Sequence, residues 1–97
     1  MKNKVITEYY FNGQIKYQGW YENGELHRNG DKPASIRYYE NGQIKYKGWH
    51  KNGKSYRNGD KPAYIKYYKN GQIEYQESYK NGVLEGLQEY WKKTDGE

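Results

Sequence analysis

Short stretches in which apolar and polar residues alternate are separated by Asn-Gly pairs along most of this chain. Such pairs favour the type I′ turn of a β-hairpin, because both central residues of that turn need a positive φ angle. The pairs that follow this rhythm begin at Asn12, Asn23, Asn41, Asn52, Asn70 and Asn81, with spacings that alternate between 11 and 18 residues. No segment has the 3.6-residue period of an amphipathic helix. The pattern predicts an all-β fold, an elongated antiparallel meander of roughly nine strands.

The same pattern repeats with a period of 29 residues. Residues 9–37 recur at 38–66 with about two thirds of the positions identical, and a third, diverging copy starts at Tyr67. A fixed period of this size indicates an array, in which each unit buries its apolar side against its neighbours. We therefore expect a single repeat domain over residues 1–97, with units at 9–37, 38–66 and 67–91 and a tail at 92–97. A surface built by repetition is typical of proteins that bind other molecules.

A two-residue turn at Asn12-Gly13 would pair Tyr10 with Ile15 and would fix the two faces of the sheet. One face is then predicted to be a packed stripe, with Tyr10, Ile15, Tyr17, Gly19, Tyr21 and Leu26 in the first unit and Tyr39, Ile44, Tyr46, Gly48, Tyr68, Ile73 and Tyr75 in the others. The opposite face is predicted to carry Tyr9, Lys16, Gln18, Trp20 and His27, then Tyr38, Lys45, Lys47, Trp49, Lys51 and Tyr56, and finally Tyr67, Glu74, Gln76 and Ser78. This second face loses its Trp and reverses its charge in the last unit. Gly19 and Gly48 leave room for an aromatic ring to lie across the backbone.

Composition changes this picture in one respect, because the core is expected to be thin. Only 33% of the residues are hydrophobic, but 14 Tyr and 3 Trp supply large side chains that suit half-exposed sheet positions. The chain has no Cys, and no apolar run is long enough to cross a membrane or to form a signal-peptide core. We expect a cytoplasmic protein, in the host cytoplasm if the gene is viral or carried by a phage. The net charge of +5 is uneven, with +5 in residues 38–66 and −2 in residues 67–97.

The repeated motif Tyr-x-x-Asn-Gly-x-hydrophobic resembles the MORN repeat, the membrane occupation and recognition nexus family. The third copy, ESYKNGVLEGLQEYW, is most similar to it, with Tyr79, Gly82, Leu84, Gly86 and Tyr90 in the family's rhythm. The resemblance implies an elongated strip of β-hairpins that acts mainly in protein binding or oligomerisation. The units that contain RNGDKPA resemble a variant common in bacteria, large DNA viruses and phages, and one bacterial branch resembles antitoxin or immunity proteins.

Two aromatic-basic features are candidate binding sites. A strip for a protein partner or for nucleic acid could be formed by Trp20 and Trp49 together with Lys16, Lys45, Lys47 and Lys51 and the nearby Tyr56. Bases stack on aromatic rings, and ammonium groups meet phosphates. Alternatively, the Lys stems lie across the rings and shield a one-layer sheet. Nucleic acid is the less favoured partner, because the chain has few Arg residues.

The second candidate is the RNGDKPA segment, which we call the insert and which occupies Arg28–Ala34 and again Arg57–Ala63. Each insert places an Arg and an Asp in a tight loop, at Arg28 and Asp31 and at Arg57 and Asp60, and the two loops could grip a partner together. Alternatively, Asn, Gly and Asp are there for the turn itself, since they tolerate positive φ and bond their own backbone. One carboxylate per loop is too few for a calcium site.

Candidate catalytic chemistry is sparse. His27 and His50 stand at non-equivalent positions of the repeat, no hydroxyl lies in a nucleophile motif, and the glycines belong to hairpin turns. We therefore expect a non-enzymatic protein that uses no cofactor and no metal. The preferred hypothesis is an inhibitor or neutraliser of a partner protein, of the antitoxin, immunity or counter-defence type. The alternatives are a scaffold that forms homo-oligomers through its terminal strand edges and a nucleic-acid or nucleotide binder that uses the Trp and Lys side chains.

Overall fold

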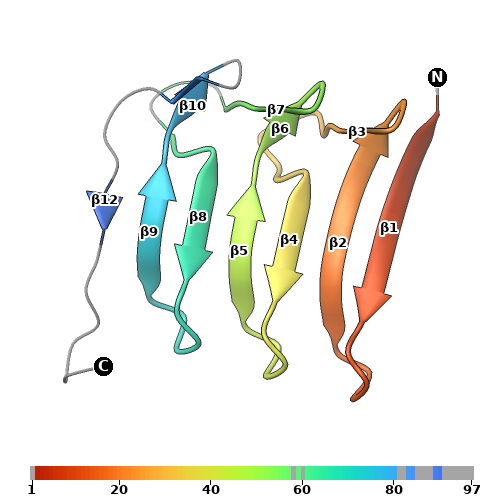
Figure 1. Ribbon diagram of the computed structural model, residues 1–97, viewed down its shortest axis with the longest axis vertical. Coiled ribbons are helices and arrows are strands. Elements are labelled where there is room, and N and C mark those ends of the chain that lie inside the picture. Colours follow the sequence, from red (N-terminus) through yellow and green to blue (C-terminus); the bar gives the residue numbers. More distant parts are fainter. Residues whose placement is uncertain (1, 58, 60, 81–82, 85–88, 91–97) are drawn as a thin grey trace.

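The computed structural model describes residues 2–57, 59, 61–80, 83–84 and 89–90. Its main sheet is antiparallel and follows the order β1-β2-β4-β5-β8-β9-β12, with β3 paired to β2 (Figure 1). The strands of this sheet are β1 (Asn3–Tyr9), β2 (Ile15–Glu22), β3 (Glu25–Leu26), β4 (Ser35–Tyr38), β5 (Ile44–Gly48), β8 (Tyr64–Tyr67), β9 (Ile73–Glu77) and β12 (Glu89–Tyr90). Two short hairpins lie beyond the ends of strands β5 and β9. They are formed by β6 (His50–Lys51) with β7 (Lys54–Ser55) and by β10 (Tyr79–Lys80) with β11 (Val83–Leu84). The all-β meander predicted from the sequence is confirmed.

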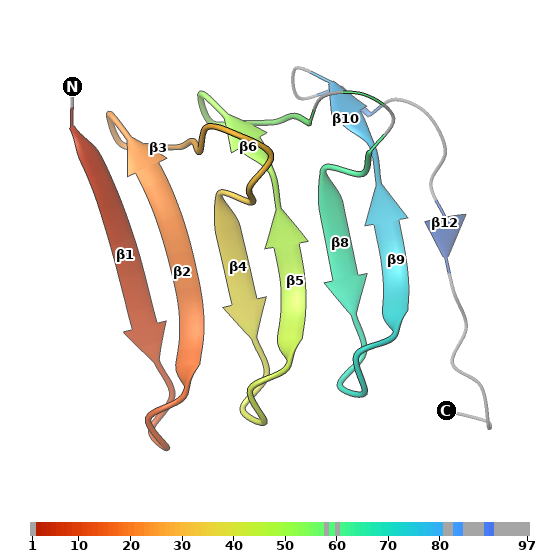
Figure 2. The ribbon, with the colours of Figure 1, turned by 180° about the vertical axis from the view of Figure 1, so that it is seen from behind.

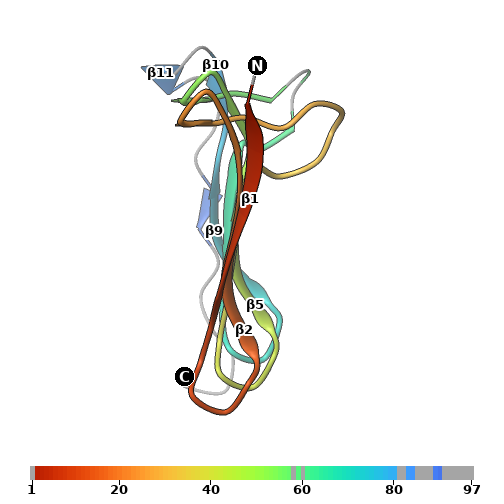
Figure 3. The ribbon, with the colours of Figure 1, turned by 90° about the vertical axis from the view of Figure 1, so that its right-hand side faces the viewer.

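The sheet forms a single layer with no second sheet or helix over either face in the part of the chain that the structure describes (Figures 2 and 3). The principal extents are 48 × 38 × 16 Å. Seen from the side, the inserts project from one face at the end of the sheet where the chain starts (Figure 3). A layer this thin leaves most side chains partly open to solvent on one face or the other.

The two kinds of Asn-Gly turn differ. At Asn23-Gly24 and Asn52-Gly53 the loop has two residues with positive φ, and Glu22 pairs with Glu25 across the first of these turns, as the type I′ prediction requires. At Asn12-Gly13 only Gly13 has positive φ, and the Tyr10 carbonyl accepts the Gly13 amide at 2.9 Å. This loop therefore has three residues, and the predicted two-residue turn at Asn12 is wrong. The Asn12 side chain stabilises the loop by accepting the Gln14 amide at 2.9 Å.

A β-bulge follows each three-residue turn and separates residues that the sequence placed together. Tyr9 pairs with Ile15, whereas Glu8 pairs with Tyr17, so Lys16 is the extra residue on β2. Since Tyr9 and Glu8 point to opposite faces, Ile15 and Tyr17 do too. The same shift recurs at Tyr38 and at Tyr67. The predicted stripe of Tyr and Ile on one face is thus wrong, because the bulge sends the Ile residues to the other face.

We name the two faces by their aromatic residues. The Trp face carries Trp20, Ile36, Trp49, Ile65 and Ile73, and the Tyr face carries Tyr17, Arg37, Tyr46, Tyr64 and Tyr75. The buried cluster lies on the Trp face, where Trp49, Ala63 and Ile65 pack with Tyr67 and Ile73. The face that was predicted to be the open binding strip is therefore the better packed of the two.

Hydrogen bonds between units hold the array together at its turns. The Tyr10 hydroxyl donates to the Tyr38 carbonyl at 2.6 Å, and the Tyr39 hydroxyl donates to the Tyr67 carbonyl at 2.7 Å. Each of these bonds joins residues 28 positions apart, so every unit is tied to the next by the same residue type. A repeat protein gains its stability from such contacts between neighbouring units.

The prediction for Gly19 is confirmed on the Tyr face. A Cβ atom there would meet the Tyr17 hydroxyl and would lie 2.7 Å from the Tyr21 ring, and the two Tyr hydroxyls hydrogen-bond across it at 2.6 Å. At Gly48 the close atoms are the Ser35 hydroxyl, at 2.9 Å, and the His50 ring, at 3.1 Å. Both glycines make room for neighbouring side chains, whereas the third unit has Glu77 at this position.

Candidate functional site

Each insert folds back over the Trp face and covers a Trp ring with its Arg. The Arg57 guanidinium carbon lies 3.8 Å from the centre of the Trp49 ring, and its Nη1 donates to the Pro62 carbonyl at 2.9 Å. In the first unit Arg28 lies 3.7 Å from the Trp20 ring centre and donates to the Pro33 carbonyl at 3.1 Å. A guanidinium plane stacked on an indole face is a favourable cation–π contact. The insert is therefore a latch over the core.

The alanine that ends each insert returns the chain to the sheet. Ala34 and Ala63 are 0% and 1% exposed. Trp49 donates its amide to the Ala63 carbonyl at 2.8 Å, and Ala63 donates its own amide to Glu77. A larger side chain would have no space at this position, next to the Trp ring and under the latch.

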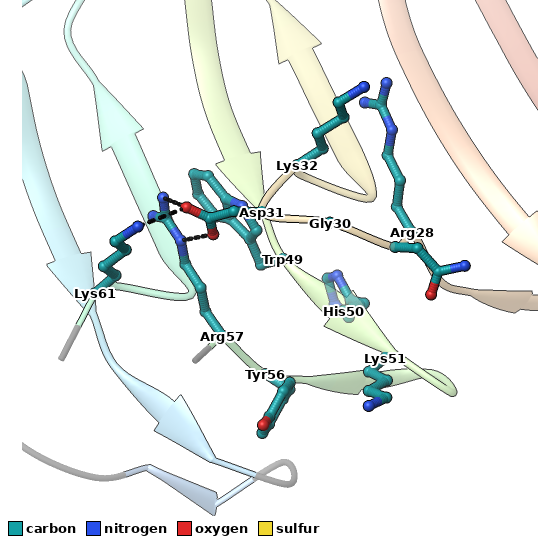
Figure 4. A pocket seen from close by; sticks show the side chains of 11 residues that line it. Arg28, Gly30, Asp31, Lys32, Trp49, His50, Lys51, Tyr56, Arg57 and Lys61 are labelled. Atoms are coloured by element: carbon teal, nitrogen blue, oxygen red, sulfur yellow. Dashed lines mark hydrogen bonds and ion pairs between the residues drawn. The ribbon is translucent and has the colours of Figure 1, made fainter. Parts of the chain in front are cut away.

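Asp31 of the first insert binds the Arg of the second (Figure 4). Arg57 donates Nε to Oδ1 at 2.7 Å and Nη2 to Oδ2 at 3.1 Å, and Lys61 donates to Oδ2 at 2.8 Å. We call this arrangement the carboxylate socket. The hydrogen bonds from Arg57, and then those from Lys61, hold the pKa of the Asp31 carboxyl well below its ordinary value. The predicted insert residues Asp31 and Arg57 thus contact each other, and Asp60 lies outside the described residues.

We predict that Asp31→Asn weakens the fold at neutral pH. Because the folded-state pKa lies below the unfolded one, the Asp31 pair stabilises the fold fully above about pH 4 and loses this effect as the pH falls further. The difference in unfolding free energy between wild type and Asp31→Asn should therefore shrink from pH 4 to pH 2.5. Urea unfolding at pH 7, 4 and 2.5 measures it, with Glu40→Gln as the control. A difference that stays constant with pH would contradict the prediction.

The Lys residues of the predicted binding strip lie beside aromatic rings. The Lys47 ammonium is 5.9 Å from the Trp49 ring centre and 5.5 Å from that of Tyr67. Lys45 lies 5.8 Å from the Tyr39 ring and Lys51 lies 5.6 Å from the Tyr56 ring. Trp49 itself is only 5% exposed, so its ring is not open for stacking with a ligand. These contacts match the alternative in which Lys side chains shield the sheet.

A cavity of about 230 Å³ lies between the two inserts (Figure 4). Among the described residues that line it, the charged ones are Arg28, Asp31, Lys32, Lys51, Arg57 and Lys61. His50 closes one side, and burial lowers the pKa of its imidazole, so its neutral form is favoured. The cavity is predominantly cationic, and Asp31 is the carboxylate that it holds.

The Tyr face carries a second, more open hollow that the sequence did not point to. It has a volume of about 370 Å³, and its lining includes Tyr17, Arg37, Tyr46, His50 and Tyr64. Arg37 donates Nε to the Tyr46 hydroxyl at 2.8 Å and lies 4.7 Å from the Tyr17 ring centre. The Tyr46 and Tyr64 ring centres are 5.4 Å apart, which is within the range of an aromatic pair. We call this feature the Tyr groove.

Burial and hydrogen bonding fix the protonation states in the Tyr groove. Burial, followed by the hydrogen bond between the Tyr17 and Tyr21 hydroxyls, raises the pKa of Tyr17 well above its ordinary value. Burial also raises the pKa of Tyr64, and the hydrogen bond to Tyr46 raises that of Arg37. Around neutral pH the phenols of Tyr17 and Tyr64 are therefore uncharged, and Arg37 beside them is a cation. This combination suits aromatic packing and hydrogen bonding.

Sequence reasoning placed Tyr17 and Tyr46 on one face, but it took that face to be the packed one and so did not identify the Tyr groove. One available signal was not used: Trp and insert occur together. Units one and two have both, whereas the third has Ser78 in place of the Trp and no insert. Because the third unit lacks both the Trp and the insert, the pattern indicates that the Trp is a core residue and that the insert covers it. Among the residues that the structure describes, no group of three metal-ligand side chains is close enough to hold an ion.

Together, the hairpins, the hydrogen bonds between units and the insert latches define a single-layer β-hairpin repeat protein. A family model described as MORN repeat variant matches residues 2–23, 34–52 and 63–81, and the chain belongs to this family. Each match covers one hairpin of the main sheet, and the inserts lie between the matched stretches. Repeats of this family are typically protein- or membrane-binding modules. Comparison with curated proteins and with solved structures finds no match.

One further property bears on the membrane. The described part of the chain contains no helix that is long and apolar enough to cross a bilayer.

Proposed function

We propose that the protein is a non-enzymatic binding module whose Tyr groove contacts a partner protein and inhibits it. The observation that carries this proposal is the composition and position of the groove, in which Arg37, Tyr46 and Tyr64 stand side by side on an uncovered face. Tyr and Arg are the residue types that most often dominate binding energy at protein interfaces. A small protein with such a face acts most simply by occupying the surface of its partner, as antitoxin, immunity and counter-defence proteins do.

The architecture supports this role in two further ways. The sheet is rigidly tied from unit to unit at its turns, so the groove is preformed and little ordering is needed on binding. The unit at 38–66 carries +5 of charge, which would steer an acidic partner toward the centre of the array. We also propose, as expected from the sequence, that the protein uses no cofactor and acts in the cytoplasm.

We predict that Tyr46→Ala lowers the affinity for the partner at least about tenfold. Truncation of a central aromatic residue at an interface commonly costs about 2 kcal/mol or more of binding free energy. Tyr9→Ala is the matched control, since Tyr9 is 63% exposed and lies on strand β1, away from the groove. Isothermal titration calorimetry with the isolated partner measures both variants, and circular dichroism verifies that they fold. Unchanged affinity of folded Tyr46→Ala would contradict the assignment of the groove.

A scaffold function is the alternative that a specific observation favours. Strand β1 pairs only with β2 in the described part of the chain, and Val5 on it is 53% exposed. An open strand edge can pair with another chain. The nucleic-acid alternative is weakened by the burial of Trp49, and salt discriminates it: affinity for nucleic acid falls steeply between 0.05 and 0.2 M salt, roughly by a thousandfold for a multi-phosphate contact, whereas an aromatic protein contact hardly changes.

A further inference from the structure

Arg28 and Lys32 of the first insert correspond to Arg57 and Lys61 of the carboxylate socket, but they hold no carboxylate of the described residues. Arg28 and Lys32 stand 29 residues before Arg57 and Lys61, and Arg28 makes the same two contacts as Arg57, on its Trp ring and with its proline carbonyl. In the second unit the remaining Nε and Nη2 donors hold Asp31. In the first unit, no carboxylate of the described residues contacts Arg28 or Lys32. The Nε and Nη2 donors of Arg28 therefore have no carboxylate acceptor among the described residues.

The repeat pattern has no aspartate at the corresponding position before Arg28. The residue that stands 29 positions before Asp31 is Lys2, so the repeat has a cation where the acceptor would be. Strand β1 also continues alongside β2 instead of forming an insert, and the Lys2 carbonyl accepts the Asn23 amide at 3.0 Å. Among the described residues, no segment supplies a carboxylate to Arg28 as the first insert does to Arg57.

The surroundings of Arg28 complete a contact surface. Figure 4 shows Arg28 and Lys32 pointing the same way and away from Asp31. Trp20, which Arg28 covers, is less buried than Trp49, and Val5, its partner across the β1–β2 pair, is 53% exposed on the same face. An apolar patch thus adjoins two cationic side chains, at the end of the array where the chain begins.

We propose that Arg28 and Lys32 form a second carboxylate socket that binds an aspartate on a turn of a partner protein. The kind of ligand is inferred from Asp31, which occupies the socket formed by Arg57 and Lys61. Asp31 lies in an exposed loop directly after Gly30, which has a φ of 77°. A planar guanidinium with two free donors matches a carboxylate in two-point geometry, and a Lys adds a third donor. This inference goes beyond the Tyr groove, since the socket lies on the Trp face, and it holds or fails independently of the groove.

The probe is a capped peptide with the sequence of residues 29–33, Asn-Gly-Asp-Lys-Pro, and its matched control has Asn in place of Asp. Nuclear magnetic resonance at pH 6 follows the Arg Nε–H and Trp indole N–H signals of the full chain as peptide is added. The Asp peptide is expected to shift the Arg28 and Trp20 signals to saturation, and the Asn peptide is not. Arg28→Gln/Lys32→Gln should lose at least about tenfold in affinity, whereas Lys54→Gln/Lys69→Gln should not.

Asp31→Asn provides an internal positive control, because it empties the socket of Arg57 and Lys61. In this variant the Asp peptide is expected to shift the Arg57 Nε–H signal as well as that of Arg28. In the wild type the Arg57 signal is expected not to shift. If Arg28 fails to respond, whether or not Arg57 does, or if the Asn peptide gives the same shift, the proposal is overturned. Self-association that Arg28→Gln/Lys32→Gln abolishes, measured by sedimentation, would identify a second copy of the chain as the source of the aspartate.

Discussion

Trp49→Ala is expected to lower the free energy of unfolding by about 3–5 kcal/mol. Trp49 is 5% exposed and lies at the centre of the buried cluster with Ala63 and Ile65, so its removal leaves a cavity that a one-layer sheet cannot close. Domains of this size are stabilised by about 5–15 kcal/mol in total. The substitution should therefore bring the protein close to unfolding at room temperature, which urea titration followed by circular dichroism will measure.

Trp20→Ala is the matched control for this prediction. The two Trp residues occupy the same position of the repeat and have the same Arg contact, but Trp20 is less buried and lies beside the open strand β1. We expect Trp20→Ala to cost less than Trp49→Ala. Equal costs would show that the core is spread evenly over the units, and the position that we give it around Trp49 would then be wrong.

Arg57→Ala should have the second-largest effect on stability, about 2–3 kcal/mol. Arg57 stacks on the Trp49 ring and bonds the Pro62 carbonyl, and these contributions are each about 1–3 kcal/mol, because the stack is partly desolvated and the bond is charge-assisted. Its removal also weakens the link between the two inserts, since Asp31 loses its bidentate partner and retains the bond from Lys61. Thermal and urea unfolding measure the loss.

Two variants define what Arg57 contributes. Arg57→Lys retains the charge near Asp31 but loses the planar stack and the fork geometry, so it should recover less than half of the loss. Arg28→Ala removes an equivalent stack without an Asp contact and should cost less than Arg57→Ala. If Arg57→Lys were as stable as the wild type, the latch would act through charge alone, contrary to the geometry described here.

The fold class could be predicted because its determinants are local. The Asn-Gly pairs act through backbone conformation, Gly19 makes its close contacts with Tyr17 and Tyr21 of the same unit, and the 29-residue period repeats these local signals. The register at Asn12 could not be predicted in the same way, because Asn-Gly suits both a two-residue turn and a three-residue turn with a bulge. The choice between them depends on the bond from the Gln14 amide to the Asn12 side chain and on pairing with the next unit.

The site could be predicted in part. The inserts were recognised as paired charged loops, and the structure brings Asp31 and Arg57 together. That they fold onto the Trp face depends on contacts between residues of different units, which spacing alone does not reveal. The one-residue error in register exchanged the Ile residues between faces. The face that carries Tyr17 and Tyr46 was then taken to be the packed one, and the groove where Arg37 and Tyr46 meet was not identified. Whether the predicted Lys45, Lys47, Lys51 and Tyr56 contact a partner stays a prediction.

Neighbouring positions on β5 offer the most direct test of the binding face. Tyr46 points to the Tyr groove and Lys47 points to the Trp face, so a photo-reactive benzoyl-phenylalanine at either position samples one face at the same depth of the sheet. Irradiation in cells that contain the natural partner, followed by mass spectrometry, identifies what each position contacts. We predict a discrete protein adduct from position 46 and none from position 47. An adduct from position 47 alone, or an adduct with nucleic acid, would contradict the proposal that the Tyr groove binds a partner protein.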